Sequence, residues 1–305
     1  MNKKVLILAG GFSKEREISL ITAKSVLKEL RKNKCKSKII EPNGHLIDNL
    51  RKYKPSVVFN ALHGRYGEDG FIQSILEKEK IKYTHSGVLA SAIAMDKTLS
   101  KEIFVKHNIL TPKFINYDFK DISNKKLKKK VEKKLNFPVV IKPVSEGSSV
   151  DVFISSKKNF LTNLNKLIKY KEVLIEQYIG GREIQVAILG KEKLGAIELK
   201  PKRKFYDYKA KYSLKAKTEH LIPVDLPPKK MDKVLGIAFK AHKLLKCRGV
   251  TRSDFKFYKN KFYLLELNTQ PGMTKLSLVP EIAAFRGISF YKLLNWIVND
   301  ASINR

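Results

Sequence analysis

The sequence has few features of a membrane protein or a disulfide-bonded protein. It contains only two cysteines, Cys35 and Cys247, and no CxxC or Cys/His cluster with metal-ligand spacing. No apolar run approaches the roughly 18 residues that span a bilayer. The apolar start, residues 1–12, is followed at once by charged residues without a cleavage pattern, which argues against a signal peptide. We therefore expect a soluble protein in a reducing, cytoplasmic setting.

Two common phosphate-binding motifs are also absent. Neither GxGxxG nor GxxxxGK[ST] occurs, which excludes the Rossmann dinucleotide and P-loop interpretations. No internal repeat or low-complexity linker is present. Any nucleotide site must therefore be built in another way.

Acidic residues are scarce relative to basic ones. Lys and Arg number 62 against 29 Asp and Glu, which gives a formal net charge of +33. Such a balance raises nucleic acid or an anionic membrane as partners. The lysines are spread over almost every segment, and the densest run, residues 125–134, has the spacing of a solvated helix face with Leu127 and Val131 opposite. We favour a compositional bias without a partner; attraction of anionic substrates such as ATP and nucleic-acid binding are the alternatives.

The first third of the chain predicts an open α/β lobe. A buried-strand run leads into the turn at Gly10 and Gly11, and apolar residues then recur at helical spacing. Strands and helices alternate from there to a boundary near residue 96. The expected strands are residues 5–9, 56–60 and one near Tyr83, and the expected helices are about 20–30, 72–79 and 88–95.

Residues 97–180 predict a small α+β lobe, and residues 181–305 predict a third lobe built on two hairpins. The central lobe ends near the glycine pair at 180–181. In the third lobe, a polar aromatic stretch at 203–217 separates the first hairpin, which turns at Gly190, from a long helix. Expected strands are 137–142, 150–154, 173–178, 183–189, 194–199, 253–258 and 262–268; expected helices are 97–107, 125–134, 161–170, 231–245 and two at the C-terminus.

Three oxygen-bearing side chains come together in the last expected strand pair. Asp254 lies on the first strand, and Glu266 and Asn268 lie two apart on the second, hence on one face of the sheet. If the strands pair as a hairpin, the three side chains are close. Such a set suits Mg²⁺, which takes few carboxylates and completes its shell with water and phosphate oxygens. The alternative is a solvated sheet edge.

A phosphate site is indicated where a strand that ends in a lysine runs into a glycine–serine turn. The turn at residues 146–149 offers backbone N–H groups and hydroxyls that can cover phosphates, and a second lysine opens the central lobe. An ordinary hairpin turn is the alternative. The candidate phosphate contacts are Lys97, Lys142, Glu146 and Ser149.

An adenine site is indicated where a strand ends just before the glycine pair at 180–181. Backbone groups there can meet the edge of a base, and a carboxylate a few residues later can hold the ribose. A strand that simply runs into a linker between lobes is the alternative. The candidate contacts are Glu176, Gln177, Tyr178, Ile179 and Glu183.

These pieces, in this order, resemble the ATP-grasp family of carboxylate–amine ligases, and within it the D-alanine:D-alanine ligases. The resemblance implies α/β and α+β lobes in a three-lobed ATP-grasp architecture with an N-terminal open α/β lobe. Its motifs cover the chain from Gly10 to Pro280 in the family's order. They are GGFSKEREISL at 10–20, LHG at 62–64, GEDG at 67–70, SGV at 86–88, MDK at 95–97, KP at 142–143, EGSSV at 146–150, FYDY at 205–208, KY at 211–212, RSD at 252–254, LELNT at 265–269, PGMT at 271–274 and SLVP at 277–280.

The resemblance implies a site for a first D-alanine. Glu15 would bind its ammonium group, and Ser148 and Tyr212 would complete a hydrogen-bonded group with that carboxylate. His63 would lie beside this substrate as an orienter or a proton acceptor. The plainer interpretations are a helix-start acid, a turn serine, a core aromatic and a packed structural histidine.

The implied reaction has two steps. The carboxylate of the first D-alanine attacks the γ-phosphate of ATP, and the amine of the second D-alanine attacks the resulting acyl phosphate. Arg252 and the backbone N–H of Gly272 would face the tetrahedral oxyanion, and Lys211 would neutralise the transferred phosphate. Ser277 and the backbone of Leu278 would take the carboxylate of the second D-alanine. A surface ion pair for the arginine and an N-cap for the serine are the plainer interpretations.

The resemblance implies further properties. Residues 200–220 would form a mobile loop that closes over ATP and keeps water away from the acyl phosphate. The hydroxyl of Tyr212 favours dipeptide formation, because relatives that make D-alanyl-D-lactate tend to carry phenylalanine there. Asp151 departs from the pattern, since family members usually have glycine at that position. ATP is the expected substrate, with two Mg²⁺ ions that Mn²⁺ can replace, and a homodimer is the expected assembly.

The preferred interpretation is ATP-dependent formation of D-alanyl-D-alanine for peptidoglycan precursors. Another ATP-grasp ligase with a different acid and amine would keep the phosphate and metal residues, but it would not need Glu15, Tyr212 and Ser277 together. A basic nucleic-acid-binding protein would need interleaved aromatics and a localised basic face, whereas the charge here is diffuse.

Overall fold

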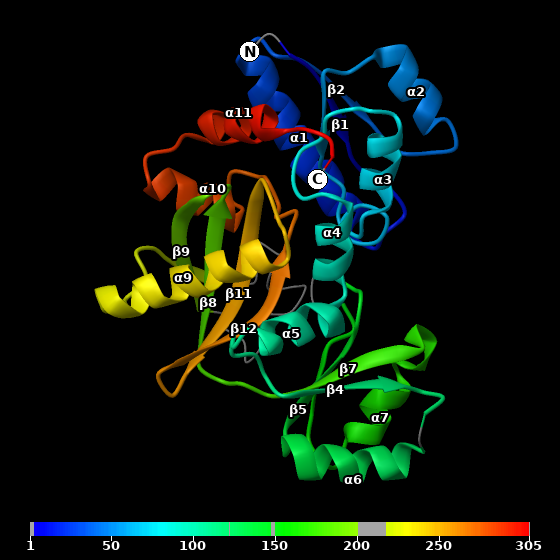
Figure 1. Ribbon diagram of the computed structural model, residues 1–305, viewed down its shortest axis with the longest axis vertical. Helices are drawn as coiled ribbons and strands as arrows, with labels where there is room; N and C mark the ends of the chain where they lie inside the picture. Colours follow the sequence, from blue (N-terminus) through cyan, green and yellow to red (C-terminus); the bar gives the residue numbers. More distant parts are fainter. Residues whose placement is uncertain (1–2, 122, 148–149, 201–217, 305) are drawn as a thin grey trace.

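Three β-sheets organise the chain, and each lies in a lobe of its own (Figure 1). The computed structural model describes residues 3–121, 123–147, 150–200 and 218–304. The first lobe and the C-terminal helices lie at one end of the molecule, the third sheet lies in the middle, and the central sheet lies at the other end (Figure 1). Among the described residues, no helix is long and apolar enough to cross a membrane.

The first lobe is the expected open α/β layer, with a parallel sheet in the order β2-β1-β3. Helices cover both faces of β1, and for this reason its apolar run is almost completely buried. Tyr83 forms only isolated bridges, so the strand expected there is wrong. The elements are β1 Lys4–Leu8, α1 Arg16–Lys32, β2 Lys36–Ile40, α2 Leu46–Tyr53, β3 Val57–Asn60, α3 Phe71–Lys78 and α4 Val88–Met95.

The central lobe has an antiparallel sheet in the order β4-β7-β5-β6. The lysine-rich helix packs Leu127 and Val131 into its core and begins at Ser123, whose hydroxyl accepts from the N–H of Lys126. The expected strand at 150–154 starts only at Phe153, and the expected helix at 161–170 is broken into an α-helix and a 3₁₀ turn. The elements are β4 Phe114–Asp118, α6 Asn124–Leu135, β5 Val139–Pro143, β6 Phe153–Ser155, α7 Phe160–Asn165, η1 Ile168–Tyr170 and β7 Glu172–Gln177.

The third lobe has an antiparallel sheet in the order β10-β9-β8-β11-β12, which contains both expected hairpins. The first hairpin turns at Gly190, where φ is +60° and a Cβ atom would lie 2.8 Å from the ring of Trp296. Helices α5 and α9 cover one face of the sheet, and α10 and α11 cover the other. The elements are α5 Lys97–Lys106, β8 Arg182–Leu189, β9 Glu192–Lys200, β10 Glu219–Leu221, α9 Pro228–Leu244, β11 Val250–Tyr258, β12 Lys261–Asn268, α10 Leu278–Phe285 and α11 Phe290–Asp300.

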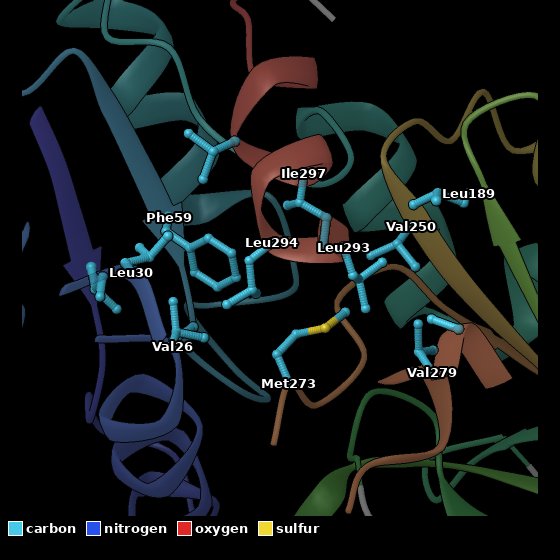
Figure 2. Close-up of a cluster of buried hydrophobic side chains, with 14 of the residues drawn as sticks. Val26, Leu30, Phe59, Leu189, Val250, Met273, Val279, Leu293, Leu294 and Ile297 are labelled. Carbon is cyan, nitrogen blue, oxygen red and sulfur yellow. The ribbon is translucent and has the colours of Figure 1, made fainter. Parts of the chain in front are cut away.

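One hydrophobic core joins the first lobe to the third. Figure 2 shows Val26 and Phe59 of the first lobe facing Leu294 of α11, with Met273 and Val250 beyond them. The central lobe has its own core. The first and third lobes are therefore packed as one unit, which fixes the residues at their junction relative to each other.

The limits of the lobes at residues 96 and 180 stay predictions. Phe104 and Ile109 fall within the predicted central lobe, but they pack into the core beneath the third sheet. Helix α5 therefore links the two lobes that border the cleft described next.

Candidate active site

A cleft lies between the central sheet and the third sheet, and ligand sites occur preferentially at such junctions between lobes. Strands β5 and β7 form one wall, and β11 and β12 contribute to the other. We call this cleft the nucleotide half. Every described residue that the sequence suggested for ATP lines it: Lys97, Lys142, Glu146, Glu176, Gln177, Tyr178, Ile179 and Glu183.

A buried carboxylate with two lysines lies at the base of the nucleotide half. The Oε1 atom of Glu176 lies 2.8 Å from Nζ of Lys101, and its Oε2 atom lies 3.0 Å from Nζ of Lys142. Burial alone would raise the pKa of Glu176, but the two ammonium groups outweigh it and hold the pKa below its ordinary value. Burial lowers the pKa of Lys101 to about 8, even though Glu176 opposes that shift. The two lysines therefore keep Glu176 ionised.

The three candidate metal ligands meet at the junction of β11 and β12, as the sequence predicted for a hairpin. Asp254 pairs with Glu266 across the two strands, and Asn268 pairs with Arg252 two positions along. Asp254 and Glu266 both line the nucleotide half, and Glu266 and Asn268 also line the neighbouring pocket. Asp254 lies on β11 inside the sheet and is 5% exposed, whereas Glu266 and Asn268 lie on the edge strand β12 and are partly buried.

The donor set at this junction fits Mg²⁺. It consists of two carboxylates and one amide oxygen, which are the hard oxygen ligands that Mg²⁺ prefers. Within the described residues, no cluster of three or more His, Cys, Asp or Glu side chains is placed to hold a metal without other ligands. A cation here would thus draw the rest of its shell from water and from a bound phosphate.

A second pocket, which we call the amino-acid half, opens beside the first. It is lined by Glu15 and His63 of the first lobe and by Arg252 and Gly272 of the third. Lys97, Glu146 and Glu266 line both halves, so the two form one continuous site. The structure thus brings together residues that lie far apart in the sequence.

Glu15 lies directly before α1 and is 6% exposed. Two glycines leave room for its carboxylate: a Cβ atom on Gly147 would lie 2.6 Å from its Oε2 atom, and one on Gly64 would lie 2.8 Å away. Any larger residue at either position would displace the carboxylate. Glu15 is therefore held against Gly147 of the central lobe.

His63 is fixed through both ring nitrogens. Its Nδ1 atom lies 3.1 Å from Oε1 of Glu68, and its Nε2 atom lies 3.2 Å from Oγ1 of Thr22. Burial alone would lower the pKa of His63, but the carboxylates of Glu68 and Glu15 outweigh it and raise the pKa above its ordinary value. A protonated His63 is thus favoured, and it makes the pocket more attractive to a carboxylate.

Arg252 is a cation of the amino-acid half, and its guanidinium bonds both carboxylate oxygens of Asp254, at 2.7 and 3.0 Å. Ser277 and Leu278 do not line this pocket, but Ser277 lies close behind it, since a Cβ atom on Gly272 would lie 3.2 Å from its Oγ atom. Ser277 precedes α10 without capping it, because its hydroxyl accepts from the N–H of Thr274 at 3.0 Å. Ser277 thus occupies the N-cap position of α10, but its hydroxyl makes no capping hydrogen bond.

Four of the candidate residues, Ser148, Ser149, Lys211 and Tyr212, lie outside the described residues, as does most of the expected loop at 200–220. The neighbouring Asp151 is described and takes φ +55°. Its carboxylate lies 2.9 Å from Nζ of Lys169 and 3.6 Å from Nζ of Lys14, and it accepts from the hydroxyl of Tyr170. Asp151 thus joins the central lobe to the first lobe and does not line the nucleotide half.

Three charged residues of the site were not anticipated from the sequence. Lys101 contacts Glu176, Glu68 contacts His63, and Lys256 lies 2.9 Å from Glu183. Lys101 lies four residues after Lys97, a spacing that places both on one face of α5. Glu68 lies inside the GEDG motif. No sequence pattern pointed to Lys256, because it reaches Glu183 through the pairing of β11 with β8.

Comparison with known proteins gives one consistent result. A family model described as D-ala D-ala ligase C-terminus matches residues 103–299. The D-alanine--D-alanine ligase of Pelagibacter ubique (strain HTCC1062) is 63% identical over 306 residues and spans 100% of both chains. That of Wolbachia pipientis wMel is 43% identical and spans 97% of this chain and 94% of its own. The crystal structure of D-alanine--D-alanine ligase from Bacillus anthracis complexed with ATP matches with a TM-score of 0.84 and 32% identity, over 98% of this chain and 97% of that one.

Proposed function

The chain belongs to the D-alanine–D-alanine ligase family, and on that premise we propose that it joins two D-alanine molecules while ATP is cleaved to ADP and phosphate. The observation that carries this function is 63% identity to such a ligase over the full length of both chains. The fold is the ATP-grasp fold of these ligases. Its two connected pockets suit a reaction that couples a nucleotide to small amino acids.

ATP would occupy the nucleotide half. The phosphates would lie near the ammonium groups of Lys97 and Lys142, beside Glu146, and Ser149 would contact them as well. The base would meet the segment Gln177–Ile179, and Glu183 would hold the ribose hydroxyls. This arrangement is supported by the side chains that line the cleft and by the ATP bound to the relative from Bacillus anthracis.

Mg²⁺ would be held by Asp254, Glu266 and Asn268, at the point where the two halves meet. A cation bound there would supply positive charge to the phosphate oxygens and lower the barrier to phosphoryl transfer. Mn²⁺ has the same preference for oxygen ligands and would replace it. Two such ions would be bound, because Glu266 lines both halves while Asp254 and Asn268 line one half each.

In the first step, a carboxylate oxygen of the first D-alanine would attack the γ-phosphorus, and ADP would leave. Glu15 would hold the ammonium group of this substrate, with Ser148 and Tyr212, and His63 would orient it. Lys211 would neutralise the transferred phosphate. The proposal is supported by the position of Glu15 and His63 next to the residues that line both halves.

In the second step, the amine nitrogen of the second D-alanine would attack the carbonyl carbon of D-alanyl phosphate, and phosphate would leave. Arg252 and the N–H of Gly272 would stabilise the oxyanion. Ser277 and the backbone of Leu278 would bind the carboxylate of this substrate at the start of α10. Closure of the loop at 200–220 would keep water from the acyl phosphate.

The test is phosphate release from ATP by the purified protein, with Mg²⁺ and with D-alanine, L-alanine or D-lactate, together with mass detection of the product. We expect D-alanine alone to stimulate release and D-alanyl-D-alanine to appear. Turnover only with another acid and amine would keep the ATP site and refute the substrates. In the first case, Tyr212→Phe tests whether the hydroxyl selects an amine over D-lactate as the second substrate.

We also propose a cytoplasmic homodimer that supplies the dipeptide for peptidoglycan precursors. The reaction needs ATP, which the cytoplasm provides, and both cysteines are free thiols in the structure. Size-exclusion chromatography with light scattering tests the assembly: a mass of one chain, 34.9 kDa, would contradict it.

A further inference from the structure

The loop at residues 61–63, which we call the His63 loop, carries His63 into the amino-acid half and belongs to no helix or strand. Because the loop lies outside the sheet, each of its three carbonyl groups accepts a hydrogen bond from a side chain. Two of these donors are serines of the first lobe, and the third is Gln270 of the third lobe. The bonds run from Oγ of Ser19 to the carbonyl oxygen of Ala61 at 2.8 Å, from Oγ of Ser13 to that of His63 at 2.6 Å, and from Nε2 of Gln270 to that of Leu62.

Gln270 follows β12 and is 2% exposed. Its backbone N–H donates to Oδ1 of Asn268 at 2.7 Å, and this turn sets the direction in which the chain leaves the strand. Two residues later, Gly272 lines the amino-acid half, but Gln270 itself lines neither half. The effect of Gln270 on a bound substrate would therefore pass through the groups that it bonds.

We propose that Gln270 is a positioning residue for the first D-alanine, because it ties the His63 loop to the end of β12 and so fixes the two walls of the amino-acid half relative to each other. This inference rests on the proposed D-alanine site. The bond from Gln270 crosses from the third lobe to the first, whereas the two serine donors belong to the first lobe, as the loop does. Displacement of a binding group by about 1 Å can cost up to about 100-fold in rate, so the position of this loop matters for the substrate.

Gln73 of α3 is a matched comparison for Gln270. It is 1% exposed, and its Nε2 atom donates to the carbonyl oxygen of Gly67 at 2.9 Å. In both glutamines the Oε1 atom has no hydrogen-bond partner among the described residues. Nδ2 of Asn60 also donates to the carbonyl oxygen of Gly67, so this group stays paired without Gln73. The two glutamines thus match in burial and in hydrogen bonding, but Gln73 joins one part of the first lobe to another.

The test compares Gln270→Met with Gln73→Met in the full chain, with D-alanine and ATP each varied. Methionine keeps an unbranched side chain and removes the amide donor. For Gln270→Met, we expect the KM for D-alanine to rise about three- to tenfold, while the KM for ATP stays within about twofold and kcat within about threefold. For Gln73→Met, all three values should stay within about twofold.

The ring of His63 reports the position of the loop without any substrate. Burial alone would lower the pKa of His63, and the 3.1 Å contact with Glu68 helps to hold that pKa above its ordinary value. A displaced loop should lengthen this contact, so the pKa of His63 should fall toward its ordinary value in Gln270→Met but not in Gln73→Met. NMR titration of the substrate-free protein measures the pKa, and His63→Gln assigns the signal.

Gln270→Asn, whose amide is one methylene shorter, should act in the same direction, and it decides the question if Gln270→Met does not fold, as judged by circular dichroism. An unchanged pKa of His63, or equal falls in both methionine variants, would overturn the role of Gln270. An unchanged KM for D-alanine beside a lower pKa would overturn its link to the first substrate. If the pKa falls only in the Gln270 variants while the wild type forms no dipeptide, the proposed function is refuted and the role of Gln270 in placing His63 stands.

Discussion

The two halves of the cleft are built in different ways. The nucleotide half is lined mainly by strands of the central and third sheets, whose side chains have fixed directions. The amino-acid half is lined by segments that follow or precede regular elements, such as Glu15 before α1 and His63 after β3. The core shared by the first and third lobes holds those segments opposite Arg252, together with a hydrogen bond from Nε2 of Gln270 to the carbonyl oxygen of Leu62. The nucleotide half thus depends on strand register, and the amino-acid half depends on packing between lobes.

The halves also differ in their charges. In the nucleotide half, Glu176 lies between Lys101 and Lys142, so the buried charges there are anchored to one another. In the amino-acid half, His63 bonds Glu68 and Arg252 bonds Asp254, and both cationic side chains also line the pocket. Substitutions in the amino-acid half should therefore alter catalysis and D-alanine binding, while the affinity for ATP should change little.

The largest effect is expected for Arg252→Ala. If Arg252 stabilises the oxyanion as proposed, its loss should lower kcat at least about 100-fold, or roughly 3 kcal/mol, with the KM for ATP nearly unchanged. Steady-state kinetics with each substrate varied measures both values. Arg51→Ala is the matched control, because Arg51 makes a similar bidentate pair with Glu79 on the surface. Unchanged turnover in Arg252→Ala would remove the oxyanion role.

Glu15→Gln should show most clearly that the two halves bind different substrates. If Glu15 binds the ammonium group of the first D-alanine as proposed, the variant loses a charge-assisted hydrogen bond worth about 1.5–3 kcal/mol, and the KM for D-alanine should rise about 10- to 100-fold. The KM for ATP should stay within about twofold, since Glu15 does not line the nucleotide half. Glu17→Gln, on the exposed side of α1, is the control. An equal rise in the KM for ATP would break the distinction between the two halves.

Acid should destabilise the first lobe through His85. This histidine is buried, neither ring nitrogen has a hydrogen-bond partner among the described residues, and burial lowers its pKa to about 3. Below the ordinary value of about 6.5, the unfolded chain binds a proton that the folded chain does not, so stability falls as pH drops. His85 should contribute a loss of about 2 kcal/mol between pH 7 and pH 5.

His85→Asn tests this contribution, because asparagine tolerates the φ of +68° at this position. Urea unfolding at pH 7 and pH 5 should show a smaller acid loss in the variant than in the wild type. His45→Asn, at an exposed position, should keep the full loss. The same loss in His85→Asn and in the wild type would show that His85 is not the acid-sensitive group.

The smallest effect is expected for Asp151→Gly. Its partners Lys14 and Lys169 are more than half exposed, so the ion pairs contribute less than about 1 kcal/mol. Glycine also suits the φ of +55° at this position. Thermal unfolding and kcat/KM for ATP should therefore change little. A tenfold loss of activity would show that this contact between the first and central lobes belongs to the site.

The sequence predicted the residues that line the nucleotide half better than it predicted the strands and tertiary contacts around them. Its residues lie within or next to strands and turns whose patterns are local, and the expected hairpin brought Asp254 to Glu266. Strands β2 and β4 were missed because both are sheet edges, where polar residues such as Lys36 and Lys38 alternate with buried ones. The pairing of Lys101 with Glu176 depends on tertiary packing, which no local pattern encodes.

The most direct test of the central claim follows one oxygen atom through the reaction. The carboxylate of the first D-alanine would attack the γ-phosphorus, so one carboxylate oxygen should leave with inorganic phosphate when the amide bond forms. With D-alanine labelled with ¹⁸O in its carboxylate, mass spectrometry should find one ¹⁸O atom in each phosphate released per dipeptide. Unlabelled phosphate alongside labelled dipeptide would contradict the acyl-phosphate route and with it the coupling of the two halves.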